Sequence, residues 1–273
     1  MSTQLTSTIS AETVERLAEE HDEPDWLREA RLDALEALDG LDFPSVIRTP
    51  GRTWTNIEDL DYESLVDPFS QTEQKELVRA EGAEVLPFHE ALREIPDLVE
   101  DHFGSAVDPQ ENRLVALSTA LFTTGTVVYV PQGVNAEDVT IRTTMEDRSL
   151  FNYTLVVTEE SSSVTILERQ ESAGSDEGER YYSGVVEVDA GENSYVQYGA
   201  LQEFDERTYN YTFKNGVADT YATVNWIEGN LGSRLTKTTV STELVGDGSE
   251  THILGAFFGH DDQHFDINSR VWH

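Results

Sequence analysis

Hydrophobic and polar residues alternate with two different periods along this chain, and the change lies near residue 121. Before it, apolar residues recur every three or four positions, as on one face of an α-helix. After Phe122 they alternate with polar residues, which is the period of a β-strand. The pattern predicts a helical region with an extended connector over residues 1–121 and a β domain over 122–273.

Local signals place the helices of the first region. Ser10 can cap one helix, and a second is expected to begin at Pro24. Gly40 is expected to end that second helix, because glycine readily adopts the left-handed backbone conformation found after helix C-termini. Residues 41–70 are rich in Pro, Gly, Asp and Thr, so we expect an extended connector there. Further helical turns are predicted over residues 71–80, 88–94, 96–103 and 109–121.

The second region reads as a series of short strands. They are predicted over residues 126–130, 152–157, 164–168, 184–188, 195–200, 207–213, 220–227, 235–244 and 252–258. Similar turns beginning at Glu159, Gly191, Gly216 and Gly248 recur at roughly 25 to 32 residues, a period typical of stacked supersecondary units. This favours a β-helix over a sandwich or barrel, with Ser163, Ser194 and Ala218 at equivalent positions. Residues 171–180 are predicted to form a mobile loop.

The charge of the chain narrows its partners. Lys and Arg number 18 and Asp and Glu number 53, which gives a formal net charge of -35. Such a surface repels nucleic-acid phosphates and anionic membranes, so neither is expected to bind. The acidity is typical of adaptation to high salt, where screening weakens repulsion between carboxylates. The sequence shows no secretory signal and no apolar run of membrane-spanning length, so a cytoplasmic location is expected.

Missing residues and motifs exclude several kinds of chemistry. The chain has no cysteine, so disulfides, thiolate nucleophiles and thiolate metal ligands are absent. It also lacks a phosphate-binding glycine loop, a dinucleotide fingerprint, an HExxH motif and a GxSxG elbow. ATPase and dehydrogenase functions therefore have no support.

The densest candidate site is the segment 259–270. In an extended strand His264 and Asp266 share a face with Asn268 and Arg270. Together with His260, these imidazoles and carboxylates are candidate ligands of a divalent metal ion. The same residues also suit the solvated face of an ordinary strand. A His/Asp metal-binding β protein and a β-helix enzyme that acts on polysaccharides through paired carboxylates both stay open as alternative functions.

Four segments carry a resemblance to a known family. The segments are Asp22 to Leu35, which resembles the pattern DEPxWxxxxRLxAL, Leu121 to Val134, which resembles GxFVYVPxGV, Trp226 to Arg234, and Gly259 to His273. In order and spacing they resemble the SufB/SufD family of iron–sulfur cluster assembly proteins. The connector around residues 43–69 and the lack of cysteine are more similar to SufD, and the acidity suggests a halophilic archaeal member.

The resemblance implies a mainly β fold, a right-handed parallel β-helix with an N-terminal α-helical region. It also implies a non-enzymatic subunit of a SufB–SufC–SufD scaffold that supports iron acquisition. The cluster would be assembled transiently on the complex, with no cofactor held stably by this chain. The expected partners are a SufB-like paralogue and a SufC-like ATPase, with a homodimer as a further arrangement. Because the pattern stops at residue 273 without a turn, we expect the chain to be truncated before the family's C-terminal helical domain, which docks the ATPase.

Overall fold

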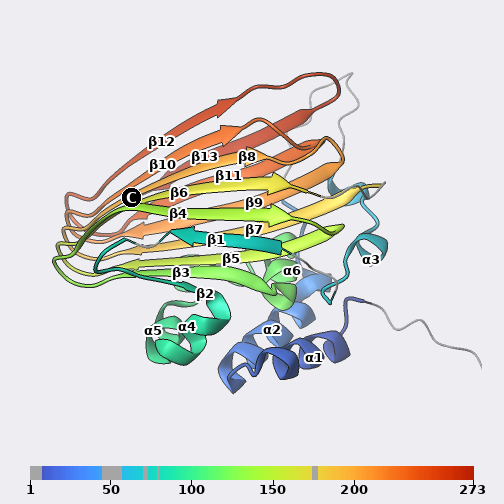
Figure 1. Ribbon diagram of the computed structural model, residues 1–273, viewed down its shortest axis with the longest axis horizontal. Helices are drawn as coiled ribbons and strands as arrows, with labels where there is room; N and C mark the ends of the chain where they lie inside the picture. Colours follow the sequence, from blue (N-terminus) through green and yellow to red (C-terminus); the bar gives the residue numbers. More distant parts are fainter. Residues whose placement is uncertain (1–7, 45–56, 70–72, 79, 174–177) are drawn as a thin grey trace, which may run out of the picture.

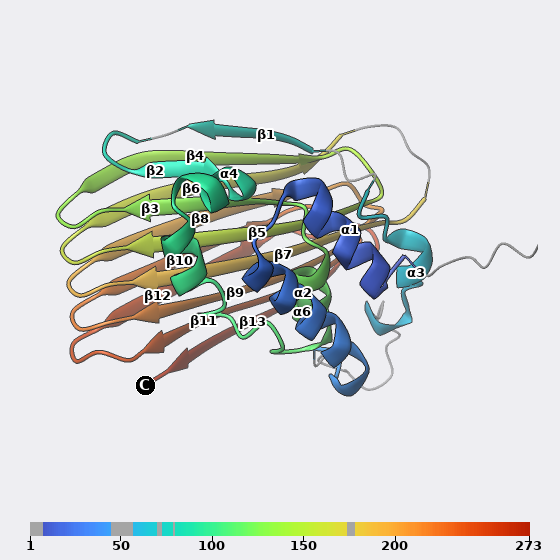
Figure 2. The ribbon, with the colours of Figure 1, turned by 90° about the horizontal axis from the view of Figure 1, so that it is seen from below.

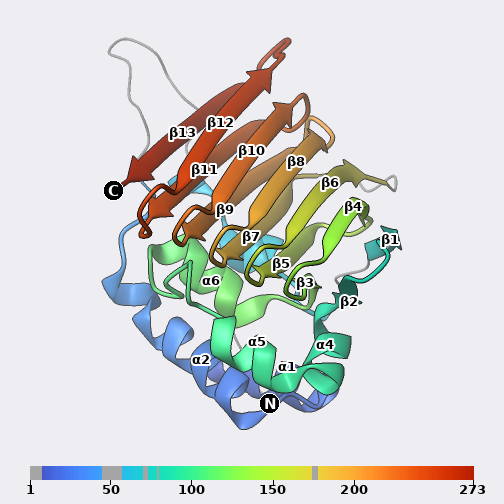
Figure 3. The same cartoon turned by 90° about the vertical axis from the view of Figure 1, so that its left-hand side faces the viewer.

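The computed structural model describes residues 8–44, 57–69, 73–78, 80–173 and 178–273. Two β-sheets face each other, and a layer of helices lies against the outer side of one of them (Figure 3). The helices are α1 (Ala11–His21), α2 (Asp25–Ala37), α3 (Tyr62–Leu65), α4 (Phe88–Glu94), α5 (Pro96–His102) and α6 (Arg113–Leu121), with short 3-10 turns η1 (Leu38–Gly40) and η2 (Ile57–Asp59).

Most of the predicted helices are present. The Ser10 hydroxyl caps α1 by accepting a hydrogen bond from the backbone N–H of Thr13 at 3.3 Å, as its position predicted. Gly40 is not a left-handed stop, because the chain leaves α2 through the 3-10 turn η1. Helix α6 begins at Arg113 after an Asn112 cap, four residues later than predicted.

The helix predicted over residues 71–80 is wrong. The described part of this segment forms strand β1 (Glu73–Val78), which pairs antiparallel with β4, while residues 71, 72 and 79 lie outside the described residues. Local sequence favours a helix here, but pairing satisfies the backbone groups at the edge of β4, and this long-range pairing outweighs the local preference.

The β-helix has about five turns of parallel strands. One sheet is ordered β1-β4-β6-β8-β10-β12 and the other β13-β11-β9-β7-β5-β3-β2, so from β3 onward successive strands alternate between the sheets (Figure 1). The strands not yet bounded are β2 (Glu84–Pro87), β3 (Thr124–Val130), β4 (Asn135–Met145), β5 (Ser149–Thr158), β6 (Ser163–Ser172), β7 (Arg180–Ala190), β8 (Tyr195–Glu203), β9 (Thr208–Ala218), β10 (Thr223–Asn230), β11 (Leu235–Leu244), β12 (Glu250–Phe257) and β13 (His264–Trp272). The sequence missed β2 and β4, and it placed residues 171–180 in a loop although β6 extends to Ser172. Residues 174–177 of that predicted loop lie outside the described residues.

One corner of each coil uses a residue in the left-handed backbone region. Equivalent positions in successive coils are occupied by Gly133, Ser161, Asn193, Tyr221 and Gly248, with φ between 55° and 73°. We call these turns the left-handed corner. The register places Ser194 opposite Ser162, not Ser163, and it places Ala218 at a strand end, so the predicted equivalence of Ser163, Ser194 and Ala218 is wrong.

The seven-stranded sheet is buried on both faces. Its inner face packs in the β-helix core, where Val156, Val188 and Val240 are fully buried. Helices lie against its outer face (Figure 2), and Tyr153 and Tyr211 belong to the buried cluster that this face shares with the helices. The six-stranded sheet has only its inner face in the core, so buried and solvent-accessible residues alternate along strands such as β6 and β10.

Candidate functional site

The structure separates the three candidate metal ligands. His260 lies in the turn after β12, with Nδ1 3.3 Å from Asp261 Oδ2 and 3.6 Å from Glu206 Oε1. Asp266 lies within β13 and forms a 3.0 Å ion pair with Lys237, whose side chain is 2% exposed. His264 begins β13, and its backbone N–H donates to the carbonyl of Arg234. Among the described residues, the group whose ligand atoms lie within 4.8 Å of one another contains His260 but neither His264 nor Asp266.

The expected alternation along β13 is present. Asp266 pairs in register with Lys237 of β11, and Asn268 Nδ2 donates to Asp266 Oδ1 at 3.1 Å. These polar groups face the helical layer. The carboxylate of Asp266 already neutralises a buried lysine, so its role in this strand is structural.

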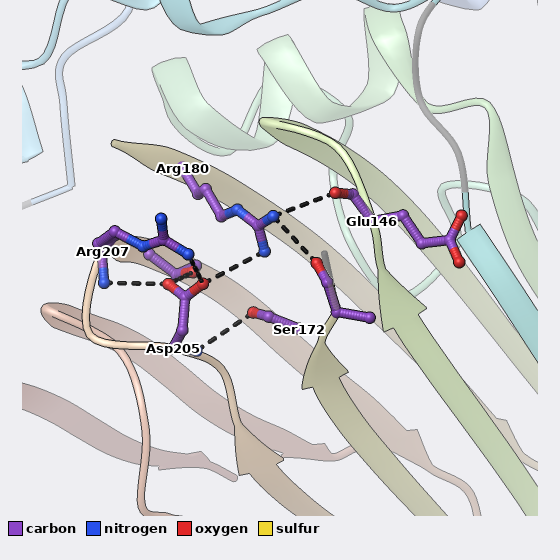
Figure 4. Close-up of polar contacts among 7 residues, drawn as sticks. Glu146, Ser172, Arg180, Asp205 and Arg207 are labelled. Atoms are coloured by element: carbon purple, nitrogen blue, oxygen red, sulfur yellow. Dashed lines mark hydrogen bonds and ion pairs between the residues drawn. The ribbon is translucent and has the colours of Figure 1, made fainter. Parts of the chain in front are cut away.

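A corner opposite the left-handed one holds a second polar cluster (Figure 4). The Asp205 carboxylate accepts bonds from Arg180 Nη1 at 3.2 Å and from Arg207 Nη2 at 2.9 Å. Arg180 also donates to the carbonyls of Glu146 and Ala173, at 3.1 and 2.9 Å. These contacts join the β4–β5, β6–β7 and β8–β9 turns, so the cluster fixes this corner.

The electrostatics of the cluster follow from its burial. Burial alone would raise the pKa of the Asp205 carboxyl, but hydrogen bonds from Arg207 and Thr208 and the charge of Arg180 hold that pKa below its usual value. Arg180 is 1% exposed, and among the described residues its Nε has no hydrogen-bond partner. Sequence reasoning missed this cluster, because nothing in the spacing of Arg180 and Asp205 shows that two loops stack.

Glu206 connects this cluster to His260. It follows Asp205 in the β8–β9 loop and turns toward the β12–β13 loop, two coils on at the same corner, where His260 and Asp261 lie. One ligand atom from each of Glu206, His260 and Asp261 lies within 4.8 Å of the others, and all three residues are exposed. An imidazole with two carboxylates suits a hard or borderline divalent ion such as Fe²⁺.

A groove lies over the outer face of β9, β11 and β13, beside the loop between α5 and α6. Its volume is about 600 Å³, and it is lined by residues 104–109 together with Asn215, Ser241, Glu243 and Arg270. A second hollow of about 450 Å³ shares Arg270 and reaches Lys237 and Asn268. Asn268 and Arg270 of β13 therefore contribute to the wall of a mixed-charge groove, whereas His264 and Asp266 do not line it.

Glu187 of β7 holds the wall of this groove in place. Its buried carboxylate accepts backbone N–H groups of Gly104, Ala106 and Val107, each at 2.9 Å, and the hydroxyl of Tyr153. Burial raises the pKa of Glu187, and these four bonds offset part of that rise. The groove is therefore preformed.

Inside the β-helix, a buried ion pair bridges the two sheets. Lys214 Nζ lies 2.9 Å from Glu228 Oε1, and the side chains are 1% and 5% exposed. Burial raises the pKa of Glu228, while Lys214 lowers it in part. Tyr198 donates to Glu168 Oε2 at 2.8 Å, and within the described part of the chain Glu168 Oε1 has no partner. The cluster makes part of the core polar.

The N-terminal motif folds into another buried pair. Glu23 accepts two bonds from Arg31, at 2.7 and 2.8 Å, and a 2.9 Å contact from His89 Nε2. Arg31 also donates to the carbonyls of Thr119 and Ala120 and lies 3.9 Å from the centre of the Phe122 ring. The motif thus joins α2 to the end of α6, where the β-helix begins.

Comparison with known proteins assigns this architecture to a family. The model described as "SUF system FeS cluster assembly, SufBD core domain" matches residues 141–273, and that described as "SufBD protein N-terminal region" matches residues 53–141. The chain belongs to the SufBD family. The family functions in iron–sulfur cluster assembly, which does not favour the polysaccharide-active alternative.

Individual relatives of this SufBD-family chain carry both subunit names. The iron–sulfur cluster assembly protein SufB of Bacillus subtilis is 26% identical over 97% of the chain and 66% of its own length. SufD of the same organism is 27% identical over 97% of the chain and 69% of its own length. A SufBD family protein of Staphylococcus epidermidis is 28% identical over 67% of the chain and 40% of its own length. The chain thus spans from 40% to 69% of these relatives, and identity alone does not separate SufB from SufD.

The longest helix in the described part of this SufBD-family chain is α2, with 13 residues. In the described ranges, every helix is too short or too polar to cross a bilayer.

Proposed function

We propose that this chain is a non-catalytic subunit of a SUF scaffold, in which it pairs with a SufB-like paralogue and a SufC-like ATPase in the cytoplasm. The observation that carries the proposal is the match to both SufBD models over residues 53–273 in a chain without cysteine. Without thiolates the chain has no sulfur ligand to offer a growing cluster, since iron–sulfur clusters are held by cysteine thiolates. This supports a SufD-like supporting role over a SufB-like role.

Co-expression tests this proposal. The chain is produced with a tagged SufB-like protein and a SufC-like ATPase from the same source, and the tagged protein is purified under anaerobic conditions. We expect the chain to co-purify and to increase the iron and sulfide recovered on the complex. Recovery of a complex that excludes the chain, in both this form and a form extended to the length of the relatives, would contradict the proposal.

Iron acquisition is the finer part of the proposal, and the geometry favours the group around His260 as the contact. Glu206, His260 and Asp261 lie close together, whereas His264 and Asp266 do not join them. Anaerobic titration calorimetry with Fe²⁺ compares the chain with a His260→Ala variant. His252→Ala is the matched control, because His252 is also exposed but lies on a strand away from this corner. Iron binding that survives His260→Ala would remove this group from the proposal.

A further inference from the structure

The groove beside the loop between α5 and α6 has the size and polarity of a ligand site, and the proposed scaffold role does not use it. Its volume of about 600 Å³ lies within the range of about 300–1,000 Å³ that is usual for small-molecule sites. Residues of β9, β11 and β13 form its floor, and residues 104–109 form one wall. Figure 2 shows no described helix over the C-terminal ends of β11 and β13. Because Glu187 holds the wall in place, binding would need little ordering of the protein.

The floor of the groove contains a nearly buried hydroxyl without a partner. Thr239 is 6% exposed, and among the described residues its hydroxyl makes no hydrogen bond. Its neighbours in the floor are satisfied, since Ser241 donates to Asn215 Oδ1 at 2.7 Å and Asn215 Nδ2 donates to the carbonyl of Ala106 at 2.6 Å. Nearly buried polar groups normally have a partner. Thr239 therefore offers a hydrogen bond to a molecule that occupies the groove.

Charges of both signs line the groove without pairing closely. Arg270 faces this space, and no carboxylate oxygen of the described residues lies within 4.0 Å of its guanidinium nitrogens. The groove also has three carboxylates, from Asp108, Glu111 and Glu243, and within the described ranges none of them forms an ion pair. Burial and the charges of Asp108 and Glu243 raise the pKa of Glu111, and Arg270 opposes this rise only in part. The groove therefore combines an isolated guanidinium with an excess of negative charge.

We propose that the groove binds a small basic amino acid, which carries one carboxylate and two ammonium groups. Arg270 binds the carboxylate, because a guanidinium presents a matching pair of donors to it. Glu111 and Glu243 accept hydrogen bonds from the ammonium groups. The hydroxyl of Thr239 completes the contacts at the floor.

Other classes of ligand fit this set of residues less well. A phosphate or another anion would meet three carboxylates around a single arginine. A diamine without a carboxylate would cover Arg270 and leave it unpaired, which costs free energy. The aromatic rings of Phe213 and Trp272, which also line the groove, suit a ligand with an aliphatic stem between its charged groups. A basic amino acid satisfies both kinds of charge and this apolar surface.

Titration calorimetry of the full chain with L-lysine tests the proposal. The two matched ligands are cadaverine, which is L-lysine without its carboxylate, and 6-aminohexanoate, which is L-lysine without its α-amino group. The buffer contains about 2 M KCl, so that salt screens the non-specific attraction of amines to a chain of net charge -35. We expect one molecule of L-lysine per chain, bound at least tenfold more tightly than either matched ligand.

Substitutions in the groove should change this preference in different ways. Arg270→Gln should weaken L-lysine binding at least tenfold and leave the weaker binding of cadaverine unchanged. Glu111→Gln should weaken the binding of both ligands at least threefold. Thr239→Val keeps the shape of the side chain and should weaken L-lysine binding at least twofold without lowering the melting temperature, because the hydroxyl has no protein partner to lose. The matched control is Arg142→Gln, since Arg142 is also partly exposed but lies in the six-stranded sheet.

Several outcomes would overturn the proposal. L-lysine that does not bind, or that binds no more tightly than cadaverine, is one of them. Another is an Arg270→Gln variant that keeps the preference of the parent, or an Arg142→Gln variant that loses it, when circular dichroism spectra and melting curves show that both fold. If Arg270→Gln does not fold, the ligand comparison on the parent chain and Thr239→Val still decide. The scaffold role is read separately, from co-purification, and does not depend on this ligand.

Discussion

Replacing Lys214 by Met should strongly destabilise the β-helix. Lys214 Nζ lies 2.9 Å from Glu228 Oε1, and only 1% and 5% of the two side chains are exposed. Methionine keeps most of the aliphatic stem, so the change removes the charge and leaves Glu228 unpaired between the sheets. Breaking a buried pair in this way costs about 3–5 kcal/mol. We expect the free energy of unfolding to fall by about that amount at pH 7.

The loss should depend on pH in a defined direction. Burial already raises the pKa of Glu228, and removal of Lys214 takes away the charge that lowers it. A carboxyl with a raised pKa favours the folded state in its protonated form, so the folded variant regains stability as pH falls toward the ordinary glutamate range. The deficit of Lys214→Met should therefore shrink between pH 7 and pH 5.

The assay is urea unfolding at fixed KCl, followed by circular dichroism, for the parent, Lys214→Met, Glu228→Gln and the double variant. The double variant should be more stable than the sum of the single losses implies, because no unpaired charge remains. The control is Arg142→Met, which removes a 3.5 Å ion pair between Arg142 and Glu76. Their side chains are 42% and 70% exposed, so this substitution should lower the free energy of unfolding by at most about 1 kcal/mol. A Lys214→Met loss no greater than that of Arg142→Met, or strict additivity in the double variant, would refute the reasoning.

Three further outcomes follow from other contacts. Burial alone would raise the pKa of Glu23, but Arg31 and His89 lower that pKa to about 2. The ionised carboxylate therefore adds about 3 kcal/mol to the free energy of unfolding above pH ~4.5, and this contribution is lost as pH falls toward 2. The stability gap between the parent and Glu23→Gln should narrow over that window, and urea midpoints that stay a constant distance apart from pH 6 to pH 2 would contradict this. Gly216→Val should lower the free energy of unfolding by about 1–3 kcal/mol, because a Cβ atom there meets core atoms at 3.1 and 3.3 Å. Gly255→Val, with no heavy atom within 4 Å, is its control, and equal losses would argue against overpacking. Glu187→Ala leaves three buried amides without an acceptor, so hydrogen exchange at residues 104–107 should accelerate at least tenfold, and unchanged rates would remove Glu187 as the anchor.

The sequence predicted the repeated β architecture because strand alternation is a local property. The helix predicted for residues 73–78 was wrong, since that segment becomes a strand only by pairing with the edge of β4. The turn register was also misread, because a serine, an asparagine and a tyrosine occupy the same left-handed position as glycine. No single residue type marked the corner.

The candidate site was predictable only in part. Alternation placed His264 and Asp266 on one face of β13, but Lys237, Asp266's partner, comes from a strand nearly 30 residues away. The meeting of Glu206 with His260 depends on the stacking of the β8–β9 and β12–β13 loops, which are two coils apart. Such contacts follow from the coil register, which periodicity alone does not determine.

Inserted residues should have different effects at the two corners of each coil, because only one of them is the left-handed corner. At this corner the N–H of each left-handed residue bonds to the carbonyl of the next coil, as Ser161 does to Glu192 and Asn193 to Thr220. One residue inserted here would break that ladder and turn every side chain of the following strand to the opposite face. The loops at the other corner vary in length, so an added peptide there extends outward and leaves the register alone. Fusions, tags and reporter insertions therefore belong in the β6–β7 loop, because the β8–β9 loop carries Asp205 and Glu206.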